Sequence, residues 1–399
     1  MQRNILALAL LLVSGALHAQ WTGTWATGTE TPNGAFEILH DSTLREIVHI
    51  SVGGDAVRIK LSNEFGSAPV VIDDAHVALR GTGAAIQPGT DRPLTFNGHP
   101  GVTIAPGAWV YSDPATLNAP AASDLAVSLY AKETKLTTVH QGALQTNYLS
   151  RDGDRAASAD LAGAEPQQSY ALLIGVEVQN PNARGAIVAL GDSITDGFAS
   201  HGDTNHRWPN LLADRLLKAG KPYGVLNEGI SANRLLHDGG ENARYAPGAA
   251  ALARFDSAVT AQAGVTAVIV LEGINDLGHP GQGAPLSETV SAADIIDAFK
   301  QIAARAHAHG IKVYIATILP FEGTRYPGYY TPEKDTKRQQ VNAWIRQNKD
   351  IDGFFDFEKA THDPAHPLRM LPQYDGGDHL HPSDAGMQAM ADAVDLSVF

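Results

Sequence analysis

Ser193, Asp378 and His381 are the residues whose types and spacing best fit nucleophilic catalysis in this sequence. A hydroxyl is a weak nucleophile at neutral pH and needs a base within hydrogen-bond reach, and an imidazole with a pKa of about 6.5 suits that work. A carboxylate must then hold the imidazole in the correct tautomer. In the stretch D-H-L-H, one turn of chain can fold Asp378 back onto His381. The three residues predict acyl transfer from an ester through the hydroxyl of Ser193.

The same chemistry needs hydrogen-bond donors for the oxyanion that forms during acyl transfer. The sequence offers the backbone N–H groups of Ser193 and Gly229 and the side-chain amide of Asn275. Loss of one such donor typically costs about 3–4 kcal/mol of transition-state stabilisation. Three acidic neighbours of these residues are interpreted as supporting side chains: Asp192, Asp196 and Asp276. For Asp192 and Asp196, which flank the serine, hydrogen bonding to the backbone is expected.

A parallel sheet is the element expected to bring these distant residues together. Residues 186–190 form a short apolar run, typical of a strand covered on both faces, and Gly191 ends it. After it, apolar runs alternate with helical patterns, which predicts an α/β fold whose strand ends share one edge. Strands are expected at residues 186–190, 223–226, 265–271, 312–318 and 353–356, and helices at residues 209–219, 249–263, 292–309, 333–348 and 383–398.

The N-terminal half has a different pattern, with a period of two residues and frequent turn residues. This predicts an all-β sandwich or jelly roll. A hairpin is expected between residues 44–52 and 57–61, with Gly53, Gly54 and Asp55 as its turn. Further strands are expected at residues 70–72, 76–79, 94–96, 102–104, 109–111 and 125–130. The pattern changes near residues 179–182, so a β domain is expected at residues 20–183 and a catalytic domain at residues 184–399.

Four blocks of the second half resemble, in order, those of the GDSL/SGNH hydrolases. They are G-D-S-I-T-D around Ser193, N-E-G-I-S with Gly229, G-I-N-D with Asn275, and D-H-L-H with His381. The resemblance implies a flavodoxin-like three-layer α/β/α domain that hydrolyses esters without a metal or another cofactor. Matched residue by residue, it implies a triad of Ser193, Asp378 and His381 and an oxyanion hole of Ser193, Gly229 and Asn275.

The N-terminal half is also similar to part of that family. W-T-G-T-W and S-V-G-G-D-A-V-R-I-K-L-S-N-E-F-G resemble a subgroup of secreted bacterial SGNH proteins grouped with acylhydrolases and arylesterases. One departure from the family pattern is Ala232, which follows N-E-G-I-S at a position where many members carry Gly. The substitution bears on how tight the turn at this position can be.

The ends and the composition narrow the class of protein further. Residues 1–19, with Arg3 and an apolar stretch, are typical of a secretory signal, which predicts a secreted protein, periplasmic or extracellular. The chain has no cysteine, which excludes disulfides, a cysteine nucleophile and thiolate metal ligands. Its net charge of −14 disfavours nucleic acid as a partner. No other stretch approaches the roughly 20 apolar residues of a membrane span.

The leading hypothesis is a secreted serine esterase that removes short acyl groups, such as acetyl, from a small-molecule or polysaccharide ester. Acyl transfer to an alcohol, lipase or arylesterase activity at the same site, and a non-catalytic carbohydrate-binding protein are the alternatives. The β domain is expected to wall the substrate cleft. The aromatic loop at residues 326–330 either stacks on a sugar or aryl group or packs as a surface loop. His379, beside His381, resembles a metal ligand, but further ligands at a recognisable spacing are missing. The sequence leaves the oligomeric state open.

Overall fold

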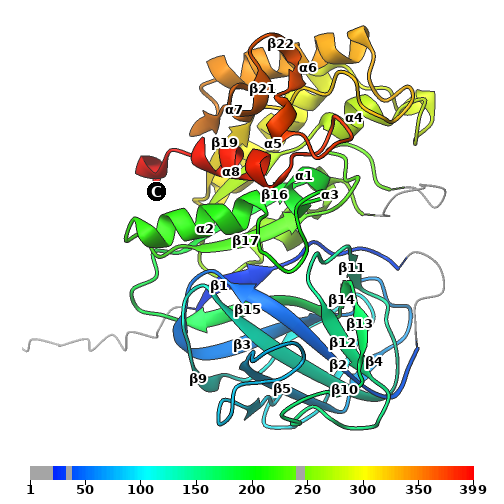
Figure 1. Cartoon of the computed structure of the whole chain (residues 1–399), viewed down its shortest axis with the longest axis vertical. Helices are drawn as coiled ribbons and strands as arrows, with labels where there is room; N and C mark the ends of the chain where they lie inside the picture. The colour runs from blue at the N-terminus through cyan, green and yellow to red at the C-terminus, as the bar shows by residue number, and fades with distance from the viewer. Residues whose placement is uncertain (1–20, 33–37, 240–247) are drawn as a thin grey trace, which may run out of the picture.

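The computed structural model describes residues 21–32, 38–239 and 248–399, in two regions that lie one above the other in Figure 1. The N-terminal region consists of antiparallel sheets, and the C-terminal region is a parallel sheet covered by helices. The predicted signal at residues 1–19 lies outside the described residues. Within the described ranges, no helix combines the length and the apolar character that a membrane crossing requires.

The parallel sheet has five strands in the order β17-β16-β18-β19-β20. Their bounds are β16 (Ala186–Gly191), β17 (Gly224–Gly229), β18 (Val265–Leu271), β19 (Lys312–Ala316) and β20 (Gly353–Phe355). Counted along the chain, this is the order 2-1-3-4-5 of a flavodoxin-like doubly wound sheet, whose ligands bind where the order reverses. The prediction of a parallel sheet is confirmed, and its switch point lies between β16 and β18.

Helices cover both faces because the strands are apolar on both sides. Along β16, Ile187 and Ala189 face a cluster that includes Leu212 of α2 (Trp208–Lys218) and Met387 of α8 (Asp384–Asp392). The opposite face packs against α3 (Ala251–Phe255), α5 (Ala292–Ala308) and α6 (Pro332–Gln347). The remaining short helices are α1 (Ser193–Asp196), α4 (Ile274–Gly278) and α7 (Phe357–Thr361), with a π turn at Asp256–Thr260 and 3-10 turns at Leu286–Glu288, Pro372–Tyr374 and Leu396–Val398.

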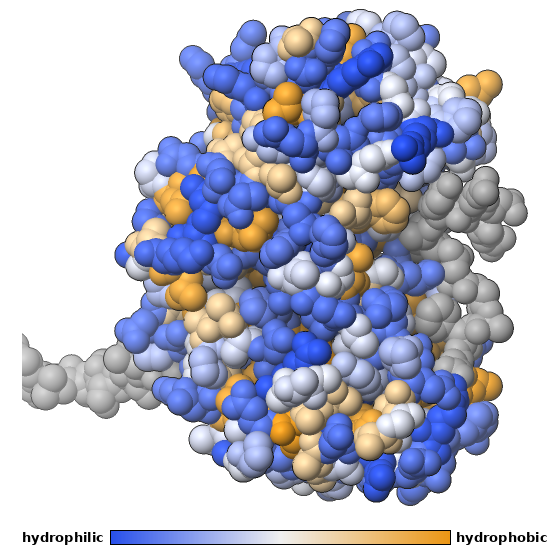
Figure 2. Space-filling model, in the orientation of Figure 1, coloured by the Kyte–Doolittle hydropathy of each residue, from blue (hydrophilic) through white to orange (hydrophobic). Residues whose placement is uncertain are grey.

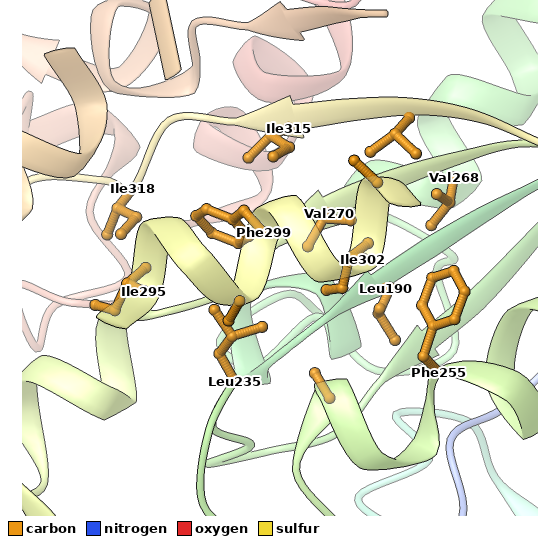
Figure 3. Packing of buried hydrophobic residues seen from close by; sticks show 14 of the residues in the cluster. Leu190, Leu235, Phe255, Val268, Val270, Ile295, Phe299, Ile302, Ile315 and Ile318 are labelled. Carbon is orange, nitrogen blue, oxygen red and sulfur yellow. The ribbon is translucent and has the colours of Figure 1, made fainter. Parts of the chain in front are cut away.

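The bounds of helix α5 follow from its capping residues, and its position follows from the packing of its apolar face on the sheet. Ser291 and Asp294 form a capping box at its start, and Gly310, with φ +71°, follows its end. Figure 3 shows α5 lying across the sheet, with Phe299 and Ile302 over the strand residues. Full burial of such a side chain stabilises the fold by about 1.5–3 kcal/mol.

The closing helix is shorter than the predicted range of 383–398. Helix α8 ends at Asp392, and only a 3-10 turn follows. The ammonium of Lys221 donates to the carbonyl oxygens of Leu396 (2.6 Å) and Phe399 (3.0 Å). This tertiary contact satisfies carbonyl groups at the chain end without a continued helix.

The N-terminal region contains two main antiparallel sheets with one hydrophobic core between them. The first has the order β1-β15-β3-β8, with β9 also on β3, and the second has the order β13-β12-β2-β10-β5-β6. The first is built from β1 (Trp21–Ala26), β3 (Gly54–Ser62), β8 (Trp109–Tyr111), β9 (Ala115–Ala119) and β15 (Leu173–Gln179). The second is built from β2 (Ile38–Ile50), β5 (Asp74–Leu79), β6 (Arg92–Pro93), β10 (Ser123–Lys135), β12 (Asn147–Ser150) and β13 (Glu165–Gln167). Two short pairs complete this region: β4 (Val70–Ile72) with β7 (Val102–Ile104), and β11 (Val139–Gln141) with β14 (Ser169–Ala171). In the C-terminal region, β21 (His362–Asp363) pairs with β22 (His366–Met370).

The predicted hairpin between residues 44–52 and 57–61 is wrong. Both segments are strands, but β2 lies between β12 and β10 in one sheet while β3 lies beside β15 in the other. Each strand pairs over a longer length with a distant segment than a short hairpin would allow, and the turn therefore carries the chain from one sheet to the other. Gly53 permits this turn, since a Cβ there would lie 2.3 Å from the carbonyl oxygen of Ala119. The strand expected at residues 94–96 is also absent, and β6 instead covers the two residues just before it.

The two regions join along β1 and β17. The N–H of Gly23 donates to the carbonyl oxygen of Ala263 (2.9 Å), and the N–H of Val225 donates to Ser51 Oγ (2.9 Å). A Cβ at Gly224 would lie 1.8 Å from the carbonyl oxygen of Gly23, so glycine is required for this approach. The β region therefore covers an edge strand of the parallel sheet. On the face shown in Figure 2, hydrophobic side chains lie in scattered groups on a mostly hydrophilic surface.

Candidate active site

Ser193 begins helix α1 directly after strand β16. Asp192 caps this helix, because its Oδ1 accepts the N–H of Ile194 at 2.9 Å. Gly191 is required before it, since a Cβ there would lie 2.1 Å from Thr195 Oγ1. The turn thus places the Ser193 hydroxyl at the carboxyl edge of the sheet, with the side chain largely buried.

The structure brings Ser193, His381 and Asp378 into one hydrogen-bonded chain. Ser193 Oγ lies 2.9 Å from His381 Nε2, and His381 Nδ1 lies 2.6 Å from Asp378 Oδ2. Asp378 Oδ1 also accepts the backbone N–H groups of Leu380 (3.0 Å) and His381 (2.9 Å), which is the local turn expected from D-x-x-H. Burial by itself raises the pKa of Asp378, but the hydrogen bonds from His381 outweigh it and lower that pKa to about 2. The carboxylate therefore stays charged and keeps a proton on Nδ1, which leaves Nε2 free to accept from Ser193.

A cavity of about 350 Å³ opens beside this chain at the switch point of the sheet. It is lined by residues of both regions: Gln141, Gly142, Ser193, Phe198, Ser231, Ala232, Asn275, His279, Gln282, Tyr326, Tyr329, Leu380 and His381. The expectation that the β region helps to wall the cleft is met by Gln141 and Gly142. The ring of Phe198, which is 46% exposed, lies 4.4 Å from the His381 ring between centroids.

Asn275 is held rigidly at this cavity. Its Nδ2 donates to the carbonyl oxygen of Asn233 (2.8 Å), and its Oδ1 accepts the hydroxyl of Tyr329 (2.6 Å). Burial raises the pKa of Tyr329 well above its ordinary value, so the phenol remains a donor. These partners fix which end of the amide is nitrogen and leave its second N–H available. The aromatic loop thus packs and lines the cavity at the same time.

The prediction of Gly229 as an oxyanion donor needs correction. Its N–H donates to Asn227 Oδ1 (2.9 Å), and Gly229 lines a separate cavity that contains His140 and Asp196. A Cβ at Gly229 would lie 2.2 Å from the backbone nitrogen of Asp196, so this glycine is needed for the packing of β17 against α1. Ser231, in the loop that follows Gly229, lines the site cavity, and so does Ala232. The backbone of Ala232 is left-handed, with φ +64°, and no hydrogen bond among the described residues occupies its N–H.

We predict that the substitutions Ala232→Gly and Gly229→Ala change the free energy of unfolding in opposite directions. Ala232→Gly relieves a conformation that costs an L-residue about 1–2 kcal/mol, partly offset by the greater freedom of glycine in the unfolded chain. We expect it to raise the free energy of unfolding by up to about 1 kcal/mol. Gly229→Ala forces β17 away from α1, and we expect a loss of about 1–3 kcal/mol. Urea unfolding of both variants measures this, and a neutral Gly229→Ala would contradict the packing role.

The other acidic residues predicted as supports hold the loops around the cavity. Asp276 accepts the N–H groups of Leu235 (2.7 Å) and Leu236 (3.0 Å), and burial raises its pKa. Burial likewise raises the pKa of Asp192 to about 7. Asp196 differs from the prediction, because its carboxylate accepts from side chains rather than from backbone N–H groups.

Two histidines at or near the site could not be recognised as site residues from the sequence. His279 lines the cavity, and burial, together with the positive charges of Arg234 and Lys334, lowers its pKa to about 4. It is therefore neutral at pH 7. His140 lies more than fifty residues before the first block, in the other region, and bonds to Asp196. No local motif marks either residue, since their roles depend on contacts between distant segments.

His379 lies away from the hydrogen-bonded chain. Its Nδ1 pairs with Asp375 Oδ2, and half of its side chain is exposed. Within the part of the chain that the structure describes, no group of three or more His, Asp or Glu side chains is placed to hold a metal ion.

Comparison with known proteins gives one family. The model of the GDSL-like lipase/acylhydrolase family matches residues 189–389, slightly more than half of the 399 residues. No curated protein matches the chain.

Several solved structures are similar over the C-terminal half. An aryl esterase from M. smegmatis is 19% identical with a TM-score of 0.41, over 52% of this chain and 95% of that chain. A carbohydrate acetylesterase family member from Sinorhizobium meliloti is 17% identical with a TM-score of 0.41, over 53% of this chain and 96% of that chain. A GDSL-like lipase from Bacteroides thetaiotaomicron is 20% identical with a TM-score of 0.38, over 53% and 87%.

Proposed function

This chain belongs to the GDSL-like lipase/acylhydrolase family and is a carboxylic ester hydrolase, and we propose that it removes short acyl groups through Ser193, His381 and Asp378. The observation that carries the proposal is the continuous chain of hydrogen bonds from the hydroxyl to the carboxylate, at 2.9 Å and 2.6 Å. Substrates of this reaction are acetyl esters of carbohydrates or of other soluble alcohols.

In the first half of the reaction, Ser193 Oγ attacks the ester carbonyl carbon while its proton moves to His381 Nε2. The carbonyl oxygen becomes an oxyanion, for which the N–H groups of Ser193 and Ala232 and the Nδ2 of Asn275 are the donors. The C–O bond to the alcohol then breaks, and His381 returns the proton to the departing oxygen.

In the second half, water attacks the acyl-enzyme carbonyl carbon and gives a proton to His381. Collapse of the second tetrahedral intermediate releases the acid and restores Ser193. Asp378 holds the imidazole and stabilises its positive charge in both halves.

The size of the cavity supports a short acyl group. Its volume of about 350 Å³ is near the small end of the range of ligand sites. Tyr329 and Asn275 are buried and bonded to each other, so they form a fixed wall. The cavity holds an acetyl group with part of its alcohol more readily than a long fatty chain.

Hydrolysis of p-nitrophenyl acetate, butyrate and octanoate tests the proposal. We expect kcat/KM to fall by about tenfold or more from acetate to octanoate, since each methylene that does not fit loses binding energy. A fluorophosphonate is expected to form one covalent adduct on Ser193, detected by mass spectrometry. A folded protein that hydrolyses none of these esters contradicts the proposal, and a preference for octanoate contradicts the short acyl group alone. Product analysis with an added sugar separates hydrolysis from transfer.

We also propose that the protein is secreted and that it divides into a β domain of sandwich or jelly-roll type at residues 20–183 and a hydrolase domain at residues 184–399. The charged, apolar and small residues of the first nineteen positions support export. Each region has its own main hydrophobic cluster, with Ala26 of β1 the one residue of the N-terminal region in the C-terminal cluster, and this supports the division. N-terminal sequencing of exported protein that still began at Met1 would contradict the signal.

A further inference from the structure

The β region reaches the site through strand β11, which ends at the cavity. Gln141 and the following Gly142 line the cavity wall. The strand is held on both sides, because it pairs with β14 and because Val139 exchanges backbone hydrogen bonds with Glu30 (2.8 and 3.0 Å). The backbone N–H of Gln141 also donates to the Glu30 carboxylate (3.0 Å). The residue between these contacts, His140, is therefore fixed in place.

His140 bridges the two regions with both ring nitrogens. Nδ1 lies 2.9 Å from the carbonyl oxygen of Gly28, and Nε2 lies 3.0 Å from Asp196 Oδ1. A carbonyl oxygen only accepts, so Nδ1 carries a proton, and a second proton on Nε2 makes the ring an imidazolium. Burial by itself lowers the pKa of His140, but the charges of Asp196 and Glu30 outweigh it and raise that pKa to about 9. The contact with Asp196 is thus a buried, charge-assisted hydrogen bond.

The contact continues from Asp196 to the loop that lines the cavity. Asp196 Oδ2 accepts the hydroxyl of Ser231 at 2.6 Å, and the next residue is Ala232. On the other side, Asn233 accepts from the Asn275 amide (2.8 Å). The loop that carries the Ala232 N–H is therefore held from one side by His140 through Asp196 and from the other by Asn275.

We propose that His140 is a positioning residue for the oxyanion: through Asp196 and Ser231, the N-terminal β region fixes the Ala232 N–H at the distance that the tetrahedral intermediate requires. The inference rests on the function proposed above. A donor that shifts by a fraction of an ångström loses most of its effect on the transition state while substrate binding changes little. The β region is then a working part of the catalytic site.

Two variants of His140 separate this role from general packing. In His140→Gln, the amide nitrogen takes the place of Nε2 and still reaches Asp196, whereas in His140→Asn it takes the place of Nδ1 and reaches only Gly28. Each variant keeps one of the two hydrogen bonds. We expect His140→Asn to lower kcat for p-nitrophenyl acetate by about 10- to 100-fold with KM changed by less than about threefold. We expect His140→Gln to retain at least about five times more activity than His140→Asn.

The inhibition constant Ki of phenylboronic acid gives a second measurement, which a purely structural role of His140 is not expected to change. The tetrahedral adduct of this acid with Ser193 places an oxygen where the oxyanion forms, so Ki is expected to rise in parallel with the loss of kcat. Ser231→Ala, made in the C-terminal region, is expected to give the same pattern and covers the case in which His140→Asn does not fold. His76→Asn is the matched control, because His76 pairs with Asp91 (2.9 Å) in the β region and does not line the cavity.

Equal activity of His140→Asn and His140→Gln, or a Ser231→Ala variant with wild-type kcat and Ki, would overturn the inference. These results differ from a failure of the proposed function, in which the wild type and Ser193→Ala would hydrolyse the ester at the same rate.

Discussion

Replacing Ser193 by alanine is expected to lower kcat/KM for p-nitrophenyl acetate by at least about 10,000-fold, because the variant has no nucleophile to form the acyl-enzyme. What activity remains would come from water attack within the oxyanion hole, which the substitution leaves in place. The fold should not change, since alanine keeps the Cβ and only the hydrogen bond to His381 Nε2 is lost. Initial rates of p-nitrophenol release at matched protein concentration measure the effect.

Ser200→Ala is the matched control for that substitution. Ser200 is also largely buried, lies seven residues later, and its hydroxyl has no hydrogen-bond partner among the described residues. We expect its kcat/KM to stay within about twofold of the wild type, as for removal of an unbonded hydroxyl. Retention of more than a few per cent of wild-type activity by Ser193→Ala would remove the basis of the mechanism.

Asp378→Asn is expected to lower kcat by about 1,000- to 10,000-fold, although the side chain keeps its size and shape. An asparagine amide that donates to His381 Nδ1 forces the proton onto Nε2. That nitrogen then faces Ser193 with a hydrogen and cannot accept the proton of the hydroxyl. Asparagine also carries no charge to stabilise the imidazolium. Steady-state kinetics, with circular dichroism to verify folding, measure the loss.

Asp375→Asn is a matched control within the same loop. Asp375 pairs with His379 as Asp378 pairs with His381, and its carboxylate also accepts backbone N–H groups of the loop, those of Gly377 (2.7 Å) and His379 (3.0 Å). His379 is not among the residues that line the site cavity, so we expect a loss of less than about tenfold, from the altered loop alone. If the two variants lose the same activity, the loss comes from loop structure and the role of Asp378 is refuted.

The C-terminal fold could be predicted because each of its strands is marked by a short, continuous stretch of the sequence. All five strands of the parallel sheet were expected from apolar runs that end in glycine or polar residues, and each of them is present. Ser193, Asn275 and His381 could be predicted as site residues because each lies in a short block at a strand end or in the last loop, and all three line one cavity in the structure. Asp378 lies three residues from His381, so a single turn determines their contact.

The contacts that the sequence did not reveal depend on packing between distant segments. Strands β2 and β3 are separated by a turn short enough for a hairpin, but they lie in different sheets, because each pairs with a longer segment from elsewhere in the chain. At the end of β17, the sequence block predicts Gly229 as the donor, yet its N–H donates to Asn227 Oδ1 and the glycine is needed for close packing.

The sequence by itself therefore determined the chemistry: a hydroxyl, an imidazole, a carboxylate and an amide on strand ends of one sheet. Only the tertiary structure decided which residues after β17 line the cavity and that His140, from the other half of the chain, bonds to Asp196. Residue types and short spacings carry the first kind of information. The second depends on left-handed backbone at Ala232 and on burial at the boundary between two regions, which no local pattern records.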